Sequence, residues 1–191
     1  MNDKAGLLFG RGEAPLVGLP DVLSQDEIIF IMAGSIPNNK STPLIDEWFG
    51  LRYKNGVFSE SLSMEKVMQI TKFQNKNIPN TNQITEEDIA QTSSLLENAV
   101  ANAKDYLYKF FVEYQERITP LLDEEIDKLA ELEEKHKDYQ MSLFDNERKR
   151  SEQERLVDEL FDKFIQWVTD TLTIQSNPYI RIVAVLKGVS L

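Results

Sequence analysis

The chain has 191 residues, 41% of them hydrophobic and 28% charged, which is enough to bury a core in one large domain or two small ones. It contains no cysteine, which excludes disulfides, thiolate metal sites and cysteine nucleophiles. No apolar run is long enough for a membrane span, and the first residues lack the pattern of a signal peptide. We therefore expect a cytoplasmic protein without membrane contact.

The net charge of −11 is concentrated in the middle of the chain. Residues 85–160 hold 21 acidic and 10 basic side chains, and the rest of the chain is balanced. An acidic surface repels phosphate backbones, so we expect this protein to meet nucleic acid only indirectly, through a partner.

The N-terminal segment, residues 1–27, is rich in glycine and proline and is expected to be irregular, with a short strand at Leu7–Phe9. A buried strand is expected at Glu27–Ala33, followed by a polar loop over Gly34–Pro43 and a second strand at Leu44–Tyr53. Asn55-Gly56 suits a type I′ turn, which would pair the end of this second strand with Val57–Phe58.

Two helix starts can be recognised by their capping residues. Ser63 is expected to cap a short helix that reaches about Phe73, and Gln74–Gln83 is expected to be a linker. Thr85, followed by three acidic residues, is expected to open a long helix. Its apolar residues recur at spacings of three and four: Leu96, Ala99, Ala103, Leu107, Phe111, Tyr114, Ile118 and Leu121.

Thr119-Pro120 predicts a break, with Thr119 as the cap and Pro120 at the first position of a new helix. After the break, a thin heptad seam suited to one neighbouring helix is formed by Leu122, Leu129, His136 and Leu143, with Leu132 and Tyr139 between them. Asp145–Glu154 is polar and marks either a hairpin tip or an exposed part of one long helix.

A wide apolar helix face that must be buried follows, formed by Leu156, Val157, Leu160, Phe161, Phe164, Ile165, Trp167, Val168 and Leu172. Ser176-Asn177-Pro178 is expected to stop the helix before a third strand at Tyr179–Val189. A terminal strand needs partners, and only the N-terminal strands can supply them. We therefore predict an α+β fold: a small mixed or antiparallel sheet joins both chain ends, and a long, coiled-coil-like helical hairpin is inserted between them. The expected parts are residues 1–27, a body of 28–84 plus 174–191, and a hairpin of 85–173.

The sequence offers no recognisable catalytic apparatus. His136 is the only histidine, so no second histidine or cysteine can share a metal with it. There is no Walker-type loop and no Gly-x-Ser-x-Gly motif. Acidic pairs such as Glu124 and Asp127 fit a solvated helix face. We expect no catalytic residue, metal or cofactor; an enzyme that uses helix carboxylates remains a weaker alternative.

Two segments are candidates for binding a partner. Gln140-Met141-Ser142-Leu143-Phe144 resembles the Gln-x-Ser-Leu-Phe peptide with which bacterial DNA-processing proteins dock on the sliding clamp. In that interpretation Leu143 and Phe144 fill an apolar pocket and Gln140 is a polar anchor; alternatively, Leu143 belongs to the seam. The second candidate is the loop with Asn38, Asn39 and Lys40, together with Trp48, beside a sheet edge.

Two segments carry a likeness to a known family. They read IFIMAGSIPNNKSTPLIDEWFGLRY (29–53) and FIQWVTDTLTIQSNPYIRIVAVLKGV (164–189). With the acidic segment between them, they resemble the C-terminal region of large bacterial Swi/Snf-type helicase-like ATPases, of the RNA-polymerase-associated or phage-defence kind. That family's ATPase residues lie in a Walker-type loop and an Asp-Glu-x-His box, which this sequence lacks.

The resemblance implies a non-catalytic accessory domain that docks a protein partner, or couples the motor, in a DNA-translocating ATPase. The partner would be the parent motor, a polymerase or the sliding clamp. The alternative is a structural protein that self-associates into a homo-oligomer through its helical hairpin.

Overall fold

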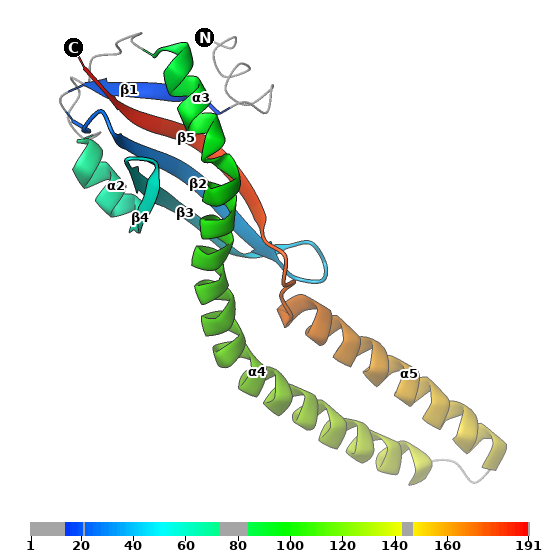
Figure 1. Ribbon diagram of the computed structural model, residues 1–191. Coiled ribbons are helices and arrows are strands. Elements are labelled where there is room, and N and C mark those ends of the chain that lie inside the picture. Colours follow the sequence, from blue (N-terminus) through cyan, green and yellow to red (C-terminus); the bar gives the residue numbers. More distant parts are fainter. Residues whose placement is uncertain (1–13, 21, 73–83, 143–146, 191) are drawn as a thin grey trace, which may run out of the picture. The chain divides into compact units, whose positions relative to one another are not determined.

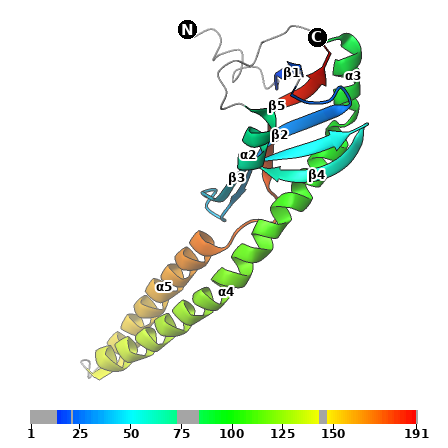
Figure 2. The same ribbon diagram turned by 90° about the vertical axis from the view of Figure 1, so that its left-hand side faces the viewer.

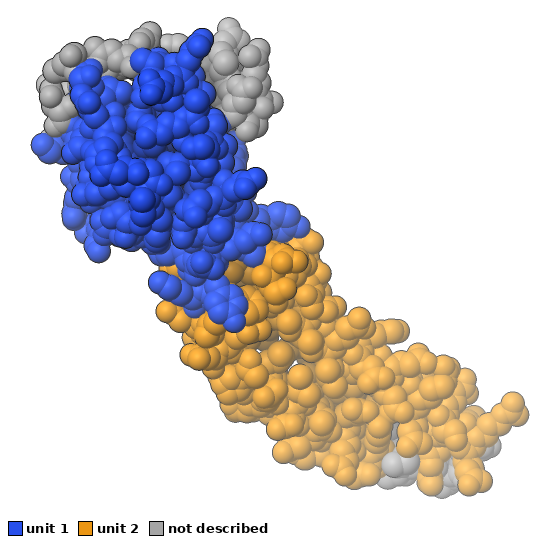
Figure 3. All heavy atoms as spheres, in the orientation of Figure 1, with its two compact units in different colours: residues 1–35, 45–109, 178–191 blue, residues 36–44, 110–177 orange. Residues whose placement is uncertain are grey.

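The computed structural model describes residues 14–20, 22–72, 84–142 and 147–190, without the side chains of residues 140–142 (Figure 1). The fold is α+β, as predicted: a five-stranded sheet links both ends of the chain, and a long helical hairpin is inserted between them. The chain divides into two compact units (Figure 3). Unit 1 comprises Met1–Ser35, Ile45–Lys109 and Pro178–Leu191; unit 2 comprises Ile36–Leu44 and Phe110–Asn177.

The sheet has the order β1-β5-β2-β3-β4. Its strands are β1 (Leu16–Pro20), β2 (Glu27–Pro37), β3 (Pro43–Lys54), β4 (Val57–Ser63) and β5 (Tyr179–Val189). The C-terminal strand β5 runs parallel to β1 and antiparallel to β2, so it lies between two N-terminal strands. The prediction that both chain ends share one sheet is therefore confirmed.

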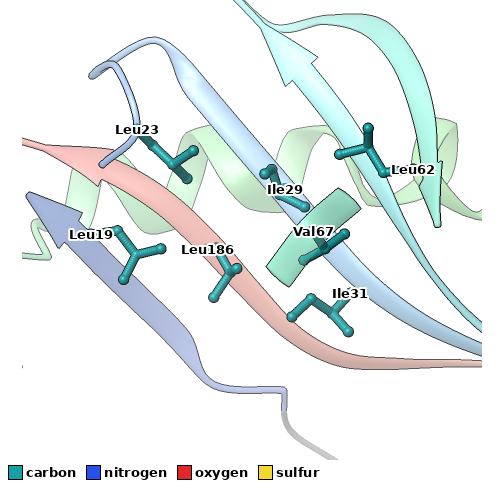
Figure 4. Packing of buried hydrophobic residues seen from close by; sticks show 7 residues of the cluster. All are labelled: Leu19, Leu23, Ile29, Ile31, Leu62, Val67 and Leu186. Carbon is teal, nitrogen blue, oxygen red and sulfur yellow. The ribbon is translucent and has the colours of Figure 1, made fainter. Parts of the chain in front are cut away.

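Helix α2 (Met64–Thr71) covers one face of the sheet (Figure 4). Its Val67 is buried against a cluster formed by Leu19, Leu23, Ile29, Ile31, Leu62 and Leu186. Ser63 caps this helix as predicted, because its hydroxyl accepts a hydrogen bond from the amide of Lys66.

The β3–β4 turn confirms the prediction from Asn55-Gly56. Both residues have positive φ, +50° and +74°, as a type I′ turn requires. Lys54 pairs with Val57, and Tyr53 pairs with Phe58.

Helices α3 (Glu86–Ser94) and α4 (Leu96–Ser142) come next; the linker expected at Gln74–Gln83 lies outside the described residues. Thr85 caps α3 in a reciprocal arrangement with Asp88, which confirms the predicted start. The first turns of α4 belong to unit 1 and lie on the face of the sheet opposite α2 (Figure 4). Small residues permit this close packing: Ala99 and Ala103 are fully buried, as is Leu107, whose side chain lies against Gly34.

Two expectations for the strands need correction. Residues 1–27 were expected to be irregular, but β1 lies within them. Its partner β5 comes from the other end of the chain, so no local pattern announces β1. Gly34–Pro37 was expected to be part of a loop, but it continues β2, because Gly34 and Ser35 pair with Ile180 and Tyr179. The strand expected at Leu7–Phe9 lies outside the described residues.

The predicted helix break at Thr119-Pro120 is wrong, since α4 continues through Pro120. The actual interruption is at Leu95, between α3 and α4. A proline in a helix loses one hydrogen bond, but packing on either side can hold the helix together. Ile118 and Leu122 on either side of Pro120 are half-buried. Helix α5 (Glu147–Leu172) also ends earlier than the Ser176-Asn177-Pro178 stop.

Replacing Pro120 with alanine should stabilise the protein by about 1–3 kcal/mol, because alanine restores the missing amide donor at an exposed position. Urea unfolding followed by circular dichroism measures this change. Thr119→Ala, at the exposed neighbouring position, is the control and should change the free energy of unfolding by less than about 0.5 kcal/mol. A Pro120→Ala variant that is no more stable than the wild type would contradict a continuous α4.

Candidate functional site

Unit 2 is built on the antiparallel pair of α5 and the part of α4 after Phe110, which lie side by side (Figures 1 and 2). The Lys137 ammonium lies 2.5 Å from the Asp158 carboxylate. At the other end of the pair, the Tyr114 hydroxyl donates a hydrogen bond to the carbonyl of Leu172 at 3.0 Å. Hydrogen bonds to Asp158, and then to Glu133, raise the pKa of Lys137 above its usual range.

The buried seam between these helices differs in part from the predicted heptads. Leu129 is buried and Leu122 half-buried, as predicted, and on α5 both Val157 and Val168 are buried. Leu132 and Tyr139 were placed in the seam, but they are exposed. A single partner helix covers only a narrow stripe of α4, and these two side chains lie to one side of that stripe.

A group of large apolar side chains remains exposed on both helices of the pair. We call it the apolar face; it consists of Leu121, Leu132 and Tyr139 on α4 and Leu156, Leu160, Phe164 and Trp167 on α5. Leu160 is 63% exposed and Trp167 is 54% exposed. The expectation that all of the apolar residues of α5 are buried is therefore wrong. Only Val157 and Val168 on this helix are buried.

The seven residues lie on one side of the hairpin. Leu132 and Leu160 each directly precede a residue that faces the seam, Glu133 on α4 and Phe161 on α5. In an antiparallel pair, positions one residue before the seam fall on the same side of both helices. The remaining members of the apolar face follow these two at helical spacings. Phe164 and Trp167 stack on each other, with ring centroids 5.8 Å apart.

The opposite side of the hairpin is acidic. Lys137 and Asp158, which bridge the two helices, mark this side. Helical spacing from these two residues places further exposed carboxylates beside them. We call this group the acidic side; it consists of Asp123, Asp127, Glu134 and Asp162. The hairpin therefore has two chemically distinct sides.

The loop between β2 and β3 caps the C-terminal end of α5 within unit 2. The Asn38 amide group donates a hydrogen bond to the carbonyl of Thr171 at 2.8 Å, and its side-chain oxygen accepts bonds from the amides of Lys40 and Thr42. The Lys40 ammonium donates to the carbonyl of Trp167 at 3.3 Å and lies over the Trp167 ring. The bond from Asn38 satisfies one of the carbonyl groups that the end of α5 leaves without a partner in the helix.

The candidate partner-binding residues therefore lie in different surroundings. The loop brings Asn38, Asn39 and Lys40 together, but Asn38 is only 2% exposed and its side chain is used internally. Asn39 and Lys40 are exposed at the end of α5. Trp48, on β3 in unit 1, is 52% exposed. The side chains of the clamp-like motif lie outside the described residues. The structure does not describe the side chain of Gln140, and it does not describe Leu143 or Phe144.

No family model, no curated protein and no solved structure matches the sequence. Among the residues that the structure describes, no three acidic or histidine side chains are grouped so that they could hold a metal ion. No helix in the described ranges has the length and apolar character needed to cross a membrane.

Among the described residues of unit 1, Lys187 is a buried cation that the sequence did not suggest. Lys187 on β5 lies beside a cavity of about 490 Å³. Its ammonium is near the Gln91 side-chain oxygen (2.7 Å), an Asp88 carboxylate oxygen (3.3 Å) and the Gln25 carbonyl (3.4 Å). Burial alone would raise the pKa of Asp88, but hydrogen bonds from Thr85 and Lys187 outweigh it and hold this pKa below its usual range. Three acceptors match the three ammonium hydrogens, so Lys187 ties β5 to α3 as a structural group.

Replacing Asn38 with alanine should destabilise the protein by about 2–3 kcal/mol, because the Thr171 carbonyl and two loop amides lose their partner in a buried position. Thermal or urea unfolding of the purified variant measures this loss. Asn39→Ala is the matched control: its side chain is exposed and makes one long hydrogen bond, 3.5 Å to Asp170, so the loss should stay below about 0.5 kcal/mol. Equal effects of the two substitutions would contradict the capping role.

Proposed function

We propose that this protein is a non-catalytic interaction module of the cytoplasm, and that its helical hairpin binds protein partners. One observation supports this proposal above the others: the hairpin carries an apolar face on one side and an acidic side on the other. Contiguous exposed apolar side chains with a polar rim are typical of protein-binding surfaces.

The proposed partner is a DNA-translocating Swi/Snf-type ATPase, either the parent motor of this domain or a motor beside which it works. Support for this partner comes from the sequence resemblance in residues 29–53 and 164–189. The acidic side agrees with such a role, since it would favour a basic protein surface over DNA. Nucleic acid would then be contacted only through the motor.

Self-assembly is the second candidate function. Its specific support is the position of the apolar face on one side of a two-helix layer. Two such layers, packed through their apolar faces, form a four-helix bundle. The sliding clamp, through Gln140–Phe144, and a polymerase, through the family resemblance, are further proposed partners.

An affinity-capture experiment in cells that encode the protein tests the proposed function. Two hairpin variants of the full chain are compared with the wild type. The first neutralises the acidic side with Asp123→Asn, Asp127→Asn and Glu134→Gln, and the second replaces Leu160 and Phe164 of the apolar face with glutamate. A control neutralises three exposed acids of unit 1 with Asp46→Asn, Glu87→Gln and Glu97→Gln.

We expect the wild type and the control to capture a helicase-like ATPase, and at least one hairpin variant to lose about tenfold or more of it. Capture that is equal for all four proteins would show that the hairpin does not dock the motor. Absence of any ATPase from the wild-type capture would remove the proposed partner.

A further inference from the structure

The geometry of the hairpin identifies an occupant for its apolar face. We propose that the apolar face binds a second copy of this chain, so that two hairpins form a four-helix bundle around a two-fold axis. This inference rests on the proposed function, because it names one partner of the hairpin. It leaves the acidic side free for the motor.

The area of the apolar face suits a dimer. Its seven large side chains are each about half exposed. Such side chains offer on the order of 100 Å² each, or about 700 Å² together. A standard stable interface buries roughly 800 Å² on each partner. The apolar face therefore approaches the size of a complete interface, and flanking polar residues would supply the remainder.

The charges on the hairpin also permit two copies to meet. Lys128, which flanks the apolar face on α4, lies 2.8 Å from Glu124 and 3.8 Å from Glu125 on its own helix. Lys135 is similarly paired with Glu131. These two cations are thus balanced locally, and the acidic side points away from the contact. A basic partner would be drawn to the acidic side, whereas a charge-balanced apolar face suits another of the same kind.

The two halves of the apolar face complement each other in shape. The α5 half is dense and aromatic, with Phe164 and Trp167 stacked, whereas the α4 half is sparser. The Lys137–Asp158 contact shows that Leu132 and Leu160 lie at about the same level of the hairpin. If the two-fold axis runs along the helices, α5 of one copy lies on α4 of the other. The bulky α5 half of each copy then contacts the sparser α4 half of the other copy, so the dimer contains this contact twice.

Sedimentation equilibrium of the full chain, from about 1 to 100 µM, tests the proposal. We expect the wild type to be a dimer with a dissociation constant of about 10 µM or lower. The double variant Leu160→Glu, Phe164→Glu should raise this constant at least about 100-fold, because it buries unpaired carboxylates in the contact. Gln166→Glu is the matched control: it adds a carboxylate at an exposed position of the same helix and should remain a dimer.

Circular dichroism verifies that each variant keeps its helices. A wild-type chain that stays monomeric across this range overturns the second-copy assignment, as does a double variant that dimerises like the wild type. The capture of a motor is measured in a separate experiment. A monomeric chain that still captures the motor would overturn the dimer alone, and a dimer that captures no motor would overturn the proposed partner alone.

Cross-linking tests the arrangement of the two copies. The chain has no cysteine of its own, so every disulfide that forms must involve the introduced cysteines. A mixture of Leu132→Cys and Leu160→Cys chains should form the mixed disulfide in preference to either homodimer. Glu134→Cys, on the acidic side, replaces Leu132→Cys as the control and should not cross-link. Equal cross-linking at residues 132 and 134 would overturn the proposed contact.

Discussion

Replacing Gly188 with alanine should destabilise the protein by about 3 kcal/mol or more and reduce the yield of folded chain. Gly188 lies on β5, opposite Leu19 of β1. A Cβ atom at this position would lie 1.9 Å from the carbonyl oxygen of Ser24 and 2.6 Å from that of Leu23. These are backbone atoms of the segment that leads into β2, so they cannot move aside as the end of a flexible side chain can.

Gly18→Ala is the matched control for Gly188→Ala. Gly18 pairs with Lys187 in the same parallel ladder, but its added Cβ would meet only side-chain atoms, those of Val189 at 3.1 Å and 3.2 Å and of Ile84 at 3.4 Å. A small side-chain shift can relieve these contacts, so we expect a loss of about 1 kcal/mol or less. Urea unfolding gives both free energies. A Gly188→Ala variant as stable as Gly18→Ala would contradict the close approach of β5 to Ser24.

Replacing Leu107 with alanine should lower the free energy of unfolding by about 2–5 kcal/mol. Leu107 is fully buried, and its side chain fills the space above Gly34, where the sheet has no side chain of its own. Truncation therefore leaves a cavity between α4 and β2 that a glycine cannot fill. Because Leu107 and Gly34 both belong to unit 1, the loss reports the packing of α4 on the sheet within that unit.

Leu96→Ala on the same helix provides the comparison for Leu107→Ala. Leu96 begins α4 and is partly exposed, so its truncation should cost about 1 kcal/mol or less. Differential scanning calorimetry of both variants measures the difference. A smaller loss for Leu107→Ala than for Leu96→Ala would show that α4 does not pack on β2 as described.

Local chemistry accounts for the parts of the fold that could be predicted. Ser63 and Thr85 carry hydroxyls that cap helices, and Asn55-Gly56 adopts the positive φ values of a tight turn. Each of these features depends on residues within a few positions of one another. Strand β5 was recognisable from its apolar β-branched run, and its place in the sheet followed from its need for partners.

The missed features depend on contacts between distant residues. Strand β1 is short, and its hydrogen bonds come from β5 at the other end of the chain. Asn38 resembles an exposed loop residue in sequence, yet it caps a helix 133 residues further along the chain. The helix at Pro120 continues because tertiary packing outweighs a local preference, and no local pattern reveals that balance.

The apolar face was not among the predicted binding segments. The sequence indicated Gln140–Phe144 in the hairpin and the loop of Asn38, Asn39 and Lys40 with Trp48. It assigned Leu132 and Tyr139 to the seam and all of the apolar residues of α5 to the interior. Apolar periodicity shows which helix positions are alike, and it cannot show how many of them one partner helix will cover. The apolar face therefore emerges only once α4 and α5 are seen paired, with Lys137 and Asp158 on the opposite side.

Cysteine labelling inside cells tests the central claim, that the hairpin is a docking element, most directly. Full-length chains carrying Leu160→Cys, on the apolar face, or Gln166→Cys, at an exposed position elsewhere on α5, are treated with a membrane-permeant maleimide, and labelling is normalised to the unfolded chain. The account predicts strong protection at residue 160 in cells, little protection at residue 166, and loss of the protection at residue 160 when the purified chain is diluted. Equally rapid labelling of both positions in cells would contradict it.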